Sequence, residues 1–291
     1  MDFSYILPPL FVTLREGFEA ALVVGIVLAC LKKADRSDLN RWVWLGVMAG
    51  ILTSMALGLG IVSWLQSVND RPLAKEMLEG SLALAAIAML SWMLIWMTRQ
   101  AKSLKREVET EIKARLSNSG ARAGIFLLVF IAVVREGLET VVFIAAQFNY
   151  GWVSPAIGAS LGLAGATILA TLLFRWGVRI NLQIFFQVMG VILLVIVGGL
   201  VIGFIRHLDS GLGLWATVSP YNICSDIADN GTCIMGLQIW NAQHILPDRE
   251  FPGIIFKTLF GYRQEFYYLQ LLTYTIFMSL VGGLYLKSLK S

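Results

Sequence analysis

Seven apolar segments dominate the chain, and each is long enough to cross a membrane as a helix. The hydrocarbon core of a bilayer takes about 20 apolar residues in helical form. Segments of this length are Tyr5–Leu31, Trp42–Leu65, Met77–Met97, Ala123–Phe148, Trp152–Phe174, Phe185–Ile205 and Tyr267–Leu286. Only 14% of the 291 residues are charged and 57% are hydrophobic, which leaves too few charges to cover a soluble domain of this size. The sequence therefore predicts an all-α polytopic membrane protein with seven transmembrane helices.

The basic residues predict which way these segments face. Lysine and arginine gather after the first, third and fifth segments and at the C-terminus. They are Lys32, Lys33, Arg36, Arg41, Arg99, Lys102, Lys105, Arg106, Lys113, Arg115, Arg122, Arg175, Arg179, Lys287 and Lys290. Cytoplasmic loops carry an excess of these residues, and all four regions can be cytoplasmic together because they alternate along the chain. We therefore expect the N-terminus outside and the C-terminus inside.

A five-residue motif, R-E-G-x-E, occurs in the middle of two of the segments. The first copy is Arg15–Glu19, and the second, 120 residues later, is Arg135–Glu139. The second and fifth segments also share glycine pairs, which are Gly46 and Gly50, and Gly158 and Gly162. Three helices per copy would make the copies enter the membrane from opposite sides, as in the inverted repeats of secondary transporters. A general likeness among apolar helices is the alternative explanation for the glycine match.

The repeat divides the chain into five expected parts. Residues 1–98 form the first three-helix repeat, 99–122 a basic cytoplasmic loop, and 123–205 the second, inverted three-helix repeat. Residues 206–266 form an extracytoplasmic loop, and 267–291 the seventh span with a cytoplasmic C-terminus.

Placing the charged motifs in the middle of apolar segments costs free energy of membrane insertion. A charge at the centre of a membrane helix costs about 2.5–3.5 kcal/mol, so two motifs of three charges cost about 15–20 kcal/mol before any pairing. Such residues are tolerated where they face a protein interior or a water-filled path and satisfy one another. The two motifs are therefore expected to face inward, toward each other.

Helical geometry gathers the charges on one face. Glu16 and Glu19 are three residues apart, and Arg15 and Glu19 are four apart, so all three share a face. Gly17 and Gly137 remove a side chain beside the carboxylates. If the motifs meet, four carboxylates and two guanidiniums give a formal charge of −2, which a bound cation would neutralise. Carboxylate oxygens suit hard ions, so the motifs predict a cation site on a transport path; buried salt bridges that only join helices are the alternative.

The residues around both motifs resemble a known family. "REGFEAALVVGIVLACLKK" and "VVREGLETVVFIAAQF" are similar to the paired motif helices of the oxidase-dependent iron permeases, which include fungal high-affinity iron permeases and bacterial EfeU-type transporters. The similarity extends to "EGSLALAAIAMLSWMLIWM" and "GIIFKTLFGYRQEF" and so covers nearly the whole chain. The first motif departs from the usual pattern by carrying Phe18 in place of leucine, between the two carboxylates.

The resemblance implies seven spans and inward transport of iron, most readily Fe(III), supplied by an extracytoplasmic ferroxidase or a periplasmic iron-delivery protein. It implies a multi-pass protein of a bacterial inner or plasma membrane. The implied iron ligands are the motif glutamates, which are Glu16, Glu19, Glu136 and Glu139. Glu79, near the outer end of the third segment, is a further candidate metal residue that would pass the ion toward the centre; the alternative is a first-turn glutamate favoured by the helix dipole.

Several further residues carry weaker signals. Thr13 lies one turn before Glu16 and extends the polar face of that helix. With the motif arginines and glycines, it is expected to support the metal site without being one of the charged ligands. Glu76, one turn before Glu79, is interpreted as a solvated residue at the membrane interface. Met89, Met93 and Met97 form a stripe that suits packing better than a soft metal ion.

The loop before the last segment is expected to be extracytoplasmic and to contain a disulfide bond. Cys224 and Cys233 enclose eight residues there, and a disulfide is the natural state of such a pair in an oxidising compartment. The loop also holds scattered titratable residues, which are His207, Asp209, Asp226, Asp229, His244, Asp248, Glu250 and Glu265. They are read mainly as solvated side chains.

The sequence favours a transporter over other classes. No ATP-binding loop, hydrolase elbow or dinucleotide fingerprint is present, which points away from enzymes, organic cofactors and nucleic-acid partners. The alternatives kept open are a permease of the same design for Fe(II), Mn(II) or Pb(II), and an ion-sensing membrane receptor. An intramembrane enzyme using the carboxylates as acid and base is disfavoured, because no His or Cys lies near either motif.

Overall fold

The computed structural model describes residues 6–67, 71–100, 110, 112, 120–146, 153–177, 181–218, 224, 232–242, 246–247 and 252–290. Helices make up most of these residues. They are α1 (Leu7–Lys33), α2 (Asn40–Ser67), α3 (Pro72–Gln100), α5 (Ala121–Ala145), α6 (Val153–Phe174), α7 (Leu182–Val218), α9 (Gly253–Phe260), α10 (Tyr268–Phe277) and α11 (Gly283–Lys290). A 3₁₀ turn, η2 (Ser37–Leu39), precedes α2, and a π-helical turn, η4 (Met278–Gly282), joins α10 to α11.

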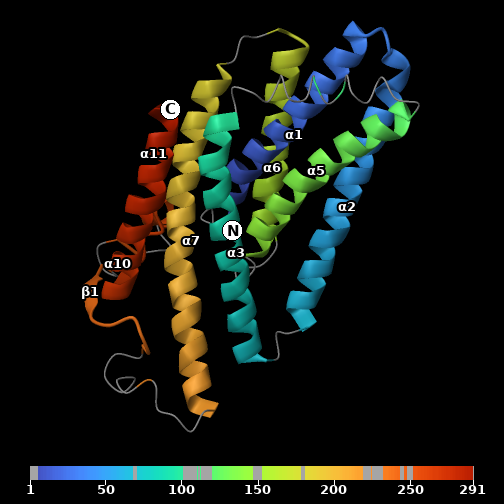
Figure 1. Cartoon of the computed structure of the whole chain (residues 1–291). Helices are drawn as coiled ribbons and strands as arrows, with labels where there is room; N and C mark the ends of the chain where they lie inside the picture. Colours follow the sequence, from blue (N-terminus) through green and yellow to red (C-terminus); the bar gives the residue numbers. More distant parts are fainter. Residues whose placement is uncertain are drawn as a thin grey trace.

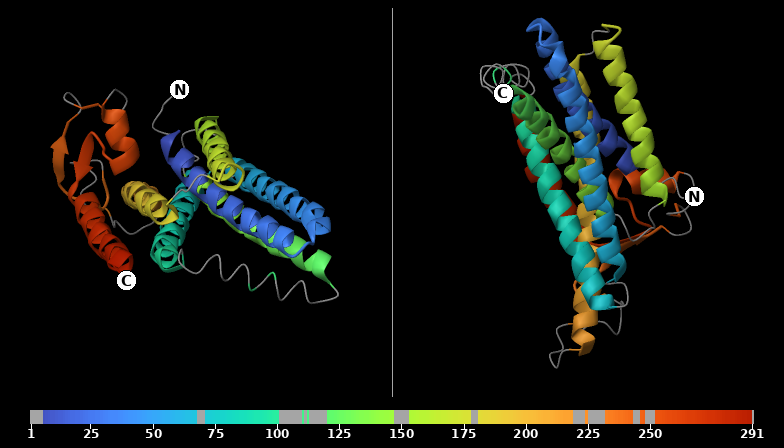
Figure 2. Two further views of the ribbon diagram at one scale, coloured as in Figure 1. Left: turned by 90° about the horizontal axis from the view of Figure 1, so that it is seen from above. Right: turned by 90° about the vertical axis from the view of Figure 1, so that its right-hand side faces the viewer.

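The long helices pack in three pairs. α1 lies along α6, α2 along α5, and α3 along α7, while α1 and α5 cross at the centre. Seen from above, α10 and α11 lie at one edge beside α7, and α2 and α5 lie at the opposite edge (Figures 1 and 2). Exchanging α1 with α5, α2 with α6 and α3 with α7 leaves this set of pairs unchanged.

The helices have the composition of membrane spans, with an instructive exception. Five stretches are long and apolar enough to cross a bilayer: Ser37–Trp64, Pro72–Trp96, Val153–Phe174, Leu182–Ala216 and Tyr268–Leu289. α1 and α5, of 27 and 25 residues, are long enough. They do not meet the same standard because every 18-residue stretch of either helix contains at least three charged residues. The chain is thus an all-α polytopic membrane protein, and α1 and α5 each carry an R-E-G-x-E motif near mid-length.

Glycines let the paired helices approach closely. A Cβ added at Gly46 would lie 2.9 Å from the Phe126 carbonyl oxygen, and one at Gly50 would lie 2.8 Å from the Val133 Cβ, both on α5. The counterparts on α6 meet α1 instead: Gly158 abuts the Ile6 carbonyl, and Gly162 abuts that of Leu10. The glycine pairs that the sequence singled out therefore form the α2–α5 and α1–α6 contacts.

One helix differs clearly from its predicted extent. The sixth apolar segment ends at Ile205, but α7 continues for another 13 residues to Val218. Residues 206–218 were expected to begin the outer loop because Arg206, His207 and Asp209 interrupt the apolar run. Helical geometry does not require an apolar sequence once the chain leaves the hydrocarbon, so polar residues can continue the same helix. His207 and Asp209 accordingly lie on a rigid helix.

After α7, the described part of the chain forms a small two-stranded sheet. β1 (Gln238–Asn241) pairs antiparallel with β2 (Glu265–Tyr267), with an irregularity between Gln238 and Trp240. The short helix α9 lies between the two strands in sequence and packs on α7. The basic segment 99–122 falls largely outside the described residues; within it, Ile112 is buried in a cluster with Leu31 and Ile125.

Candidate metal site

The two R-E-G-x-E motifs face each other where α1 and α5 cross. One carboxylate oxygen from each of Glu16, Glu136 and Glu139 lies within 4.8 Å of the other two. All three side chains are buried, and Glu16 is only 1% exposed. Three carboxylates from two helices therefore share a space of the size that one metal ion occupies.

Arg15 is enclosed with the carboxylates of its own motif. Its Nε lies 3.1 Å from Glu19 Oε1 and its Nη1 lies 3.4 Å from Glu16 Oε1. The side chain is 2% exposed. Because separate guanidinium nitrogens face separate carboxylates, Arg15 fixes the directions of both.

Arg135 makes similar pairs but lies at an opening. Its Nε lies 3.3 Å from Glu139 Oε1 and 3.9 Å from Glu136 Oε1, and its guanidinium stands 5.1 Å from the centre of the Trp96 ring. Its side chain is 48% exposed. Here a pocket of about 390 Å³ reaches the cluster; it is lined by Met89, Trp92, Met93, Trp96, Arg135 and Glu139.

The cluster contains more acceptors than donors. Among the residues that the structure describes, Glu16 Oε2, Glu136 Oε2 and Glu139 Oε2 are buried and receive no hydrogen bond. The Thr13 Oγ1, one turn earlier on α1, is in the same condition. Buried acceptors without donors are costly, and a cation coordinated by the carboxylates would remove that cost.

The motif glycines allow the second helix of each pair to approach beside the carboxylates. A Cβ on Gly17 would lie 3.0 Å from the Ala166 Cβ on α6. A Cβ on Gly137 would overlap the Ser54 hydroxyl and lie 2.6 Å from its Cβ, on α2. Ser54 and Ala166 are each eight residues past the first glycine of their helix's pair, so the two contacts correspond.

Comparisons with known proteins decide the family. The model of the iron permease FTR1 family matches residues 6–288, which is nearly the whole chain. The chain belongs to this family of iron permeases.

Relatives from bacteria match over most of their length. An uncharacterized protein of Synechocystis, slr0964, is 46% identical over 99% of this chain and 96% of its own. The ferrous iron permeases EfeU of Escherichia coli and Yersinia pestis are each 32% identical over 88% of this chain, and cover 86% and 84% of their own. No solved structure matches the chain. The predicted iron permease family is confirmed, and with it iron as the transported substrate.

This FTR1-family chain has a second group of ligand-type side chains, away from the first. Glu79 is buried at the start of α3, and His207 Nδ1 on α7 lies 3.7 Å from Glu79 Oε2 and 2.8 Å from Glu76 Oε2. Glu76, interpreted as a solvated interfacial residue, is 26% exposed and also bonded to His207 on α7. The three-residue spacing of Glu76 and Glu79, which repeats that of Glu16 and Glu19, was the signal that the sequence offered.

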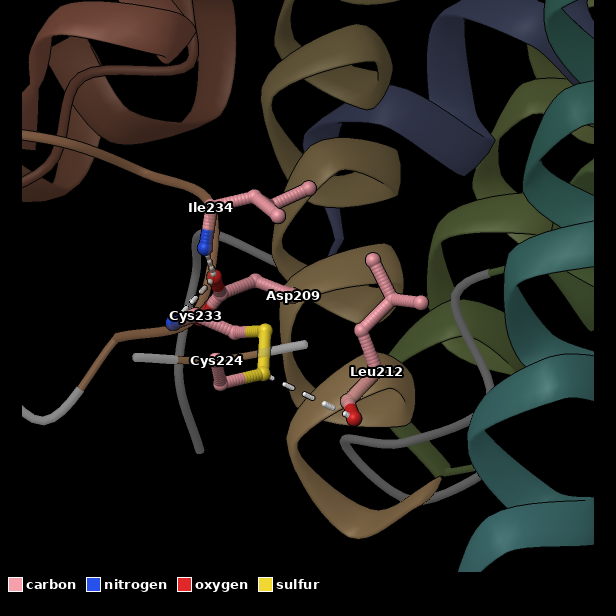
Figure 3. The surroundings of a disulfide bond; sticks show 5 residues. All are labelled: Asp209, Leu212, Cys224, Cys233 and Ile234. Carbon is pink, nitrogen blue, oxygen red and sulfur yellow. Dashed lines mark hydrogen bonds between the residues drawn. A yellow bond between two sulfur atoms is a disulfide. The ribbon is translucent and has the colours of Figure 1, made fainter. Parts of the chain in front are cut away.

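The two cysteines that follow α7 are joined. Cys224 and Cys233 form a disulfide with Cα atoms 4.9 Å apart. Asp209 on α7 accepts hydrogen bonds from the backbone N–H groups of Cys233 and Ile234, at 2.8 and 2.6 Å (Figure 3). Asp209 was read as solvated; it instead anchors the loop to the helix. Several candidate residues lie outside the described part of the chain. They are the side chain of Met97 and the residues Gln147, Asp226, Asp229, His244, Asp248 and Glu250.

Proposed function

We propose that this protein imports iron through the carboxylate cluster formed by Glu16, Glu19, Glu136 and Glu139. Two observations carry the proposal: the carboxylates of Glu16, Glu136 and Glu139 meet within 4.8 Å, and the Oε2 atom of each is buried with no hydrogen bond from a described residue. Glu19 adjoins this group through Arg15, which pairs with both Glu16 and Glu19. Arg15 and Arg135 orient the carboxylates, Gly17 and Gly137 make room beside them, and Thr13 adds a neutral oxygen. Buried salt bridges alone would not need carboxylates in excess of arginines.

The architecture of the proposed permease is seven spans, with α1–α3 repeated in inverted form by α5–α7 and the α10–α11 segment added. The exchange-symmetric pairing of helices supports this, as do the matching contacts of Gly17 with Ala166 and of Gly137 with Ser54. Sites of inverted-repeat transporters lie between the halves near the bilayer midplane. The position of both motifs at the crossing of α1 and α5 supports such a site.

We propose an N-out, C-in orientation in a bacterial inner membrane. The basic connections support it, because Lys32 and Lys33 end α1 and Arg175 follows α6, at the ends assigned to the cytoplasm. The Cys224–Cys233 disulfide belongs to the opposite side of the protein, where an oxidising compartment would preserve it.

Fe(III) is the ion that the central donor set suits best. All of its charged ligands are carboxylates, which are hard donors, and a triply charged ion more than neutralises a formal charge of −2. An extracytoplasmic ferroxidase or periplasmic delivery protein would supply it. Inward movement of three charges through 100 mV of membrane potential would release about 7 kcal/mol, so uptake needs no nucleotide.

Fe(II) is the second candidate, because the EfeU relatives are named ferrous iron permeases. The two oxidation states are separable in proteoliposomes with radioactive iron, supplied either as Fe(III) citrate or as Fe(II) kept reduced by ascorbate. Faster saturable uptake of Fe(III) supports the proposal, and uptake restricted to Fe(II) would overturn the oxidation state. Preferred uptake of Mn(II) or Pb(II), or tight binding without flux, would favour another permease or a receptor instead.

A further inference from the structure

A second cluster of potential metal ligands joins α3 to α7. One ligand atom from each of Glu76, Glu79 and His207 lies within 4.8 Å of the other two. Glu76 and Glu79 come from successive turns of α3, and His207 faces them from α7. The cluster therefore draws on two helices that also pack along each other (Figure 1).

The cluster holds more negative charge than a simple hydrogen bond requires. His207 Nδ1 lies 2.8 Å from Glu76 Oε2, which is enough to join the helices. The same nitrogen also lies 3.7 Å from Glu79 Oε2, so two carboxylates converge on one imidazole nitrogen. With a neutral imidazole the formal charge is −2, which matches a divalent cation.

The surroundings hold these side chains in position. A Cβ on Gly80 would lie 3.5 Å from the His207 Cβ, so α3 and α7 are close at this level. Two residues past His207, Asp209 fastens the disulfide loop to α7 through two backbone N–H groups (Figure 3). The ligands thus stand on braced helices, which favours a site over a chance contact.

Two members of the cluster are partly exposed, and the third lies deeper. The side chains of Glu76 and His207 are 26% and 20% exposed, and that of Glu79 is 4% exposed. At 1.5 Å per helical residue, His207 lies about 38 Å along α7 from Leu182. Counted from Leu182 as one boundary of the hydrocarbon core, which is about 30 Å thick, this end of α7 would reach or pass the other boundary.

We propose that Glu76, Glu79 and His207 form an outer site for a divalent cation of the Fe(II), Mn(II), Co(II) and Zn(II) class, distinct from the central carboxylate cluster. Two carboxylates and one imidazole are a mixed donor set that such ions accept, whereas the central set is all oxygen. The site's role of passing its cation to the centre rests on the Fe(II) form of the proposed function, but its ability to bind does not.

Binding can be measured with the central site disabled. The full chain carrying Glu16→Gln and Glu136→Gln is purified in detergent and titrated with Co²⁺ alone, following its visible absorption and its stoichiometry by equilibrium dialysis. We expect one Co²⁺ per chain in that background. Adding His207→Gln should weaken binding by at least about tenfold, because loss of a supporting residue alone costs a metal site about that much. Glu265→Gln, on β2, is the matched control and should leave binding unchanged.

Two further measurements keep the outcomes distinct. The midpoint of thermal unfolding without metal should change little in His207→Gln, since glutamine can still donate to Glu76. If His207→Gln does not fold, Glu79→Gln is the second variant, because it leaves the Glu76–His207 bond intact. Absence of Co²⁺ binding, or binding indifferent to both His207→Gln and Glu79→Gln, would refute the outer site.

The proposed function fails by a different result. If Glu16→Gln and Glu136→Gln leave iron flux intact while Co²⁺ still binds at His207, the outer site stands and the central permeation site does not. For the linked role, His207→Gln in an otherwise unaltered chain, supplied with Fe(II) kept reduced by ascorbate, should raise the half-saturating Fe(II) concentration about tenfold and keep the maximal rate. A lower maximal rate at an unchanged half-saturating concentration would contradict that role.

Discussion

Arg15 and Arg135 hold the same position in two copies of one motif, yet their side chains are 2% and 48% exposed. Both pair through Nε with the glutamate four residues later. On the α1 side, Val12 packs in a cluster with Leu193 of α7 and Tyr285 of α11. On the α5 side, Arg135 borders the pocket beside Trp96. The central site is therefore closed on one side and open on the other.

This asymmetry predicts unequal effects of lysine at the two positions. Lysine offers a single point charge, whereas Arg15 uses two separate nitrogens to hold Glu16 and Glu19. We expect Arg15→Lys to lose most iron uptake, at least about tenfold, and Arg135→Lys to lose less, because the contacts of Arg135 are longer and its side chain is half exposed. Initial uptake rates in proteoliposomes, normalised to inserted protein, measure this. Equal rates for both variants would show that enclosure of Arg15 is irrelevant to transport.

The motif glutamates are expected to be individually essential. Glutamine keeps the size and polarity of the side chain but removes the charge, so Glu16→Gln, Glu19→Gln, Glu136→Gln and Glu139→Gln should each abolish iron uptake. Membrane insertion should persist, because each change lowers the cost of burying charge. Uptake is compared with the amount of folded protein by size-exclusion chromatography. Normal transport in two of the four variants would favour salt bridges that only join helices.

The two motif glycines should differ in their tolerance of alanine. Gly137→Ala drives a methyl group into Ser54, so it should destabilise the protein by about 1–3 kcal/mol through overpacking. Gly17→Ala meets the Ala166 methyl at 3.0 Å and Leu163 Cδ1 at 3.4 Å, without direct overlap, and should cost less. Thermal unfolding in detergent measures both, with Gly60→Ala as control because that position has open space.

A compensating change tests whether that contact is the cause. Ser54→Gly removes the side chain that Gly137→Ala would strike, and the double variant should be more stable than Gly137→Ala alone. No recovery in the double variant would place the cost of Gly137→Ala somewhere other than the α2–α5 contact.

The orientation predicts which residues a membrane-impermeant thiol reagent reaches. In a Cys30→Ser background, cysteine is introduced at Lys33, exposed at the end of α1, or at Leu237, exposed beside β1. Leu237→Cys should react in intact cells, and Lys33→Cys only after the membrane is opened. The reverse pattern would invert the proposed topology.

Much of the central site could be predicted because it depends on spacing within single helices. The four-residue step from Arg15 to Glu19 sets their ion pair, and the glycine steps in α2 and α6 set the helix approaches. The family resemblance supplied the identity of the ion. No such local rule describes the different exposure of Arg15 and Arg135, which depends on which helices cover each one.

The outer cluster could not be predicted for a related reason. His207 and Glu76 are 131 residues apart, and their contact requires both the packing of α3 on α7 and the continuation of α7 past Ile205. An apolar segment ends where charges begin, whereas a helix can continue into water. Reading Arg206 as the start of a loop therefore separated His207 from the helix that positions it.

The way the helices are paired has a mechanical consequence. Gly17 seats α1 on α6, and Gly137 seats α5 on α2, so each motif helix is held by a helix from the other half of the sequence. We expect the pair α1–α6 and the pair α2–α5 to move as two rigid bodies. The crossing of α1 and α5 would act as the hinge between them. A rocking motion about that crossing would open the carboxylates to one side of the membrane and then the other. Each half of the sequence would thereby contribute one helix to each moving part.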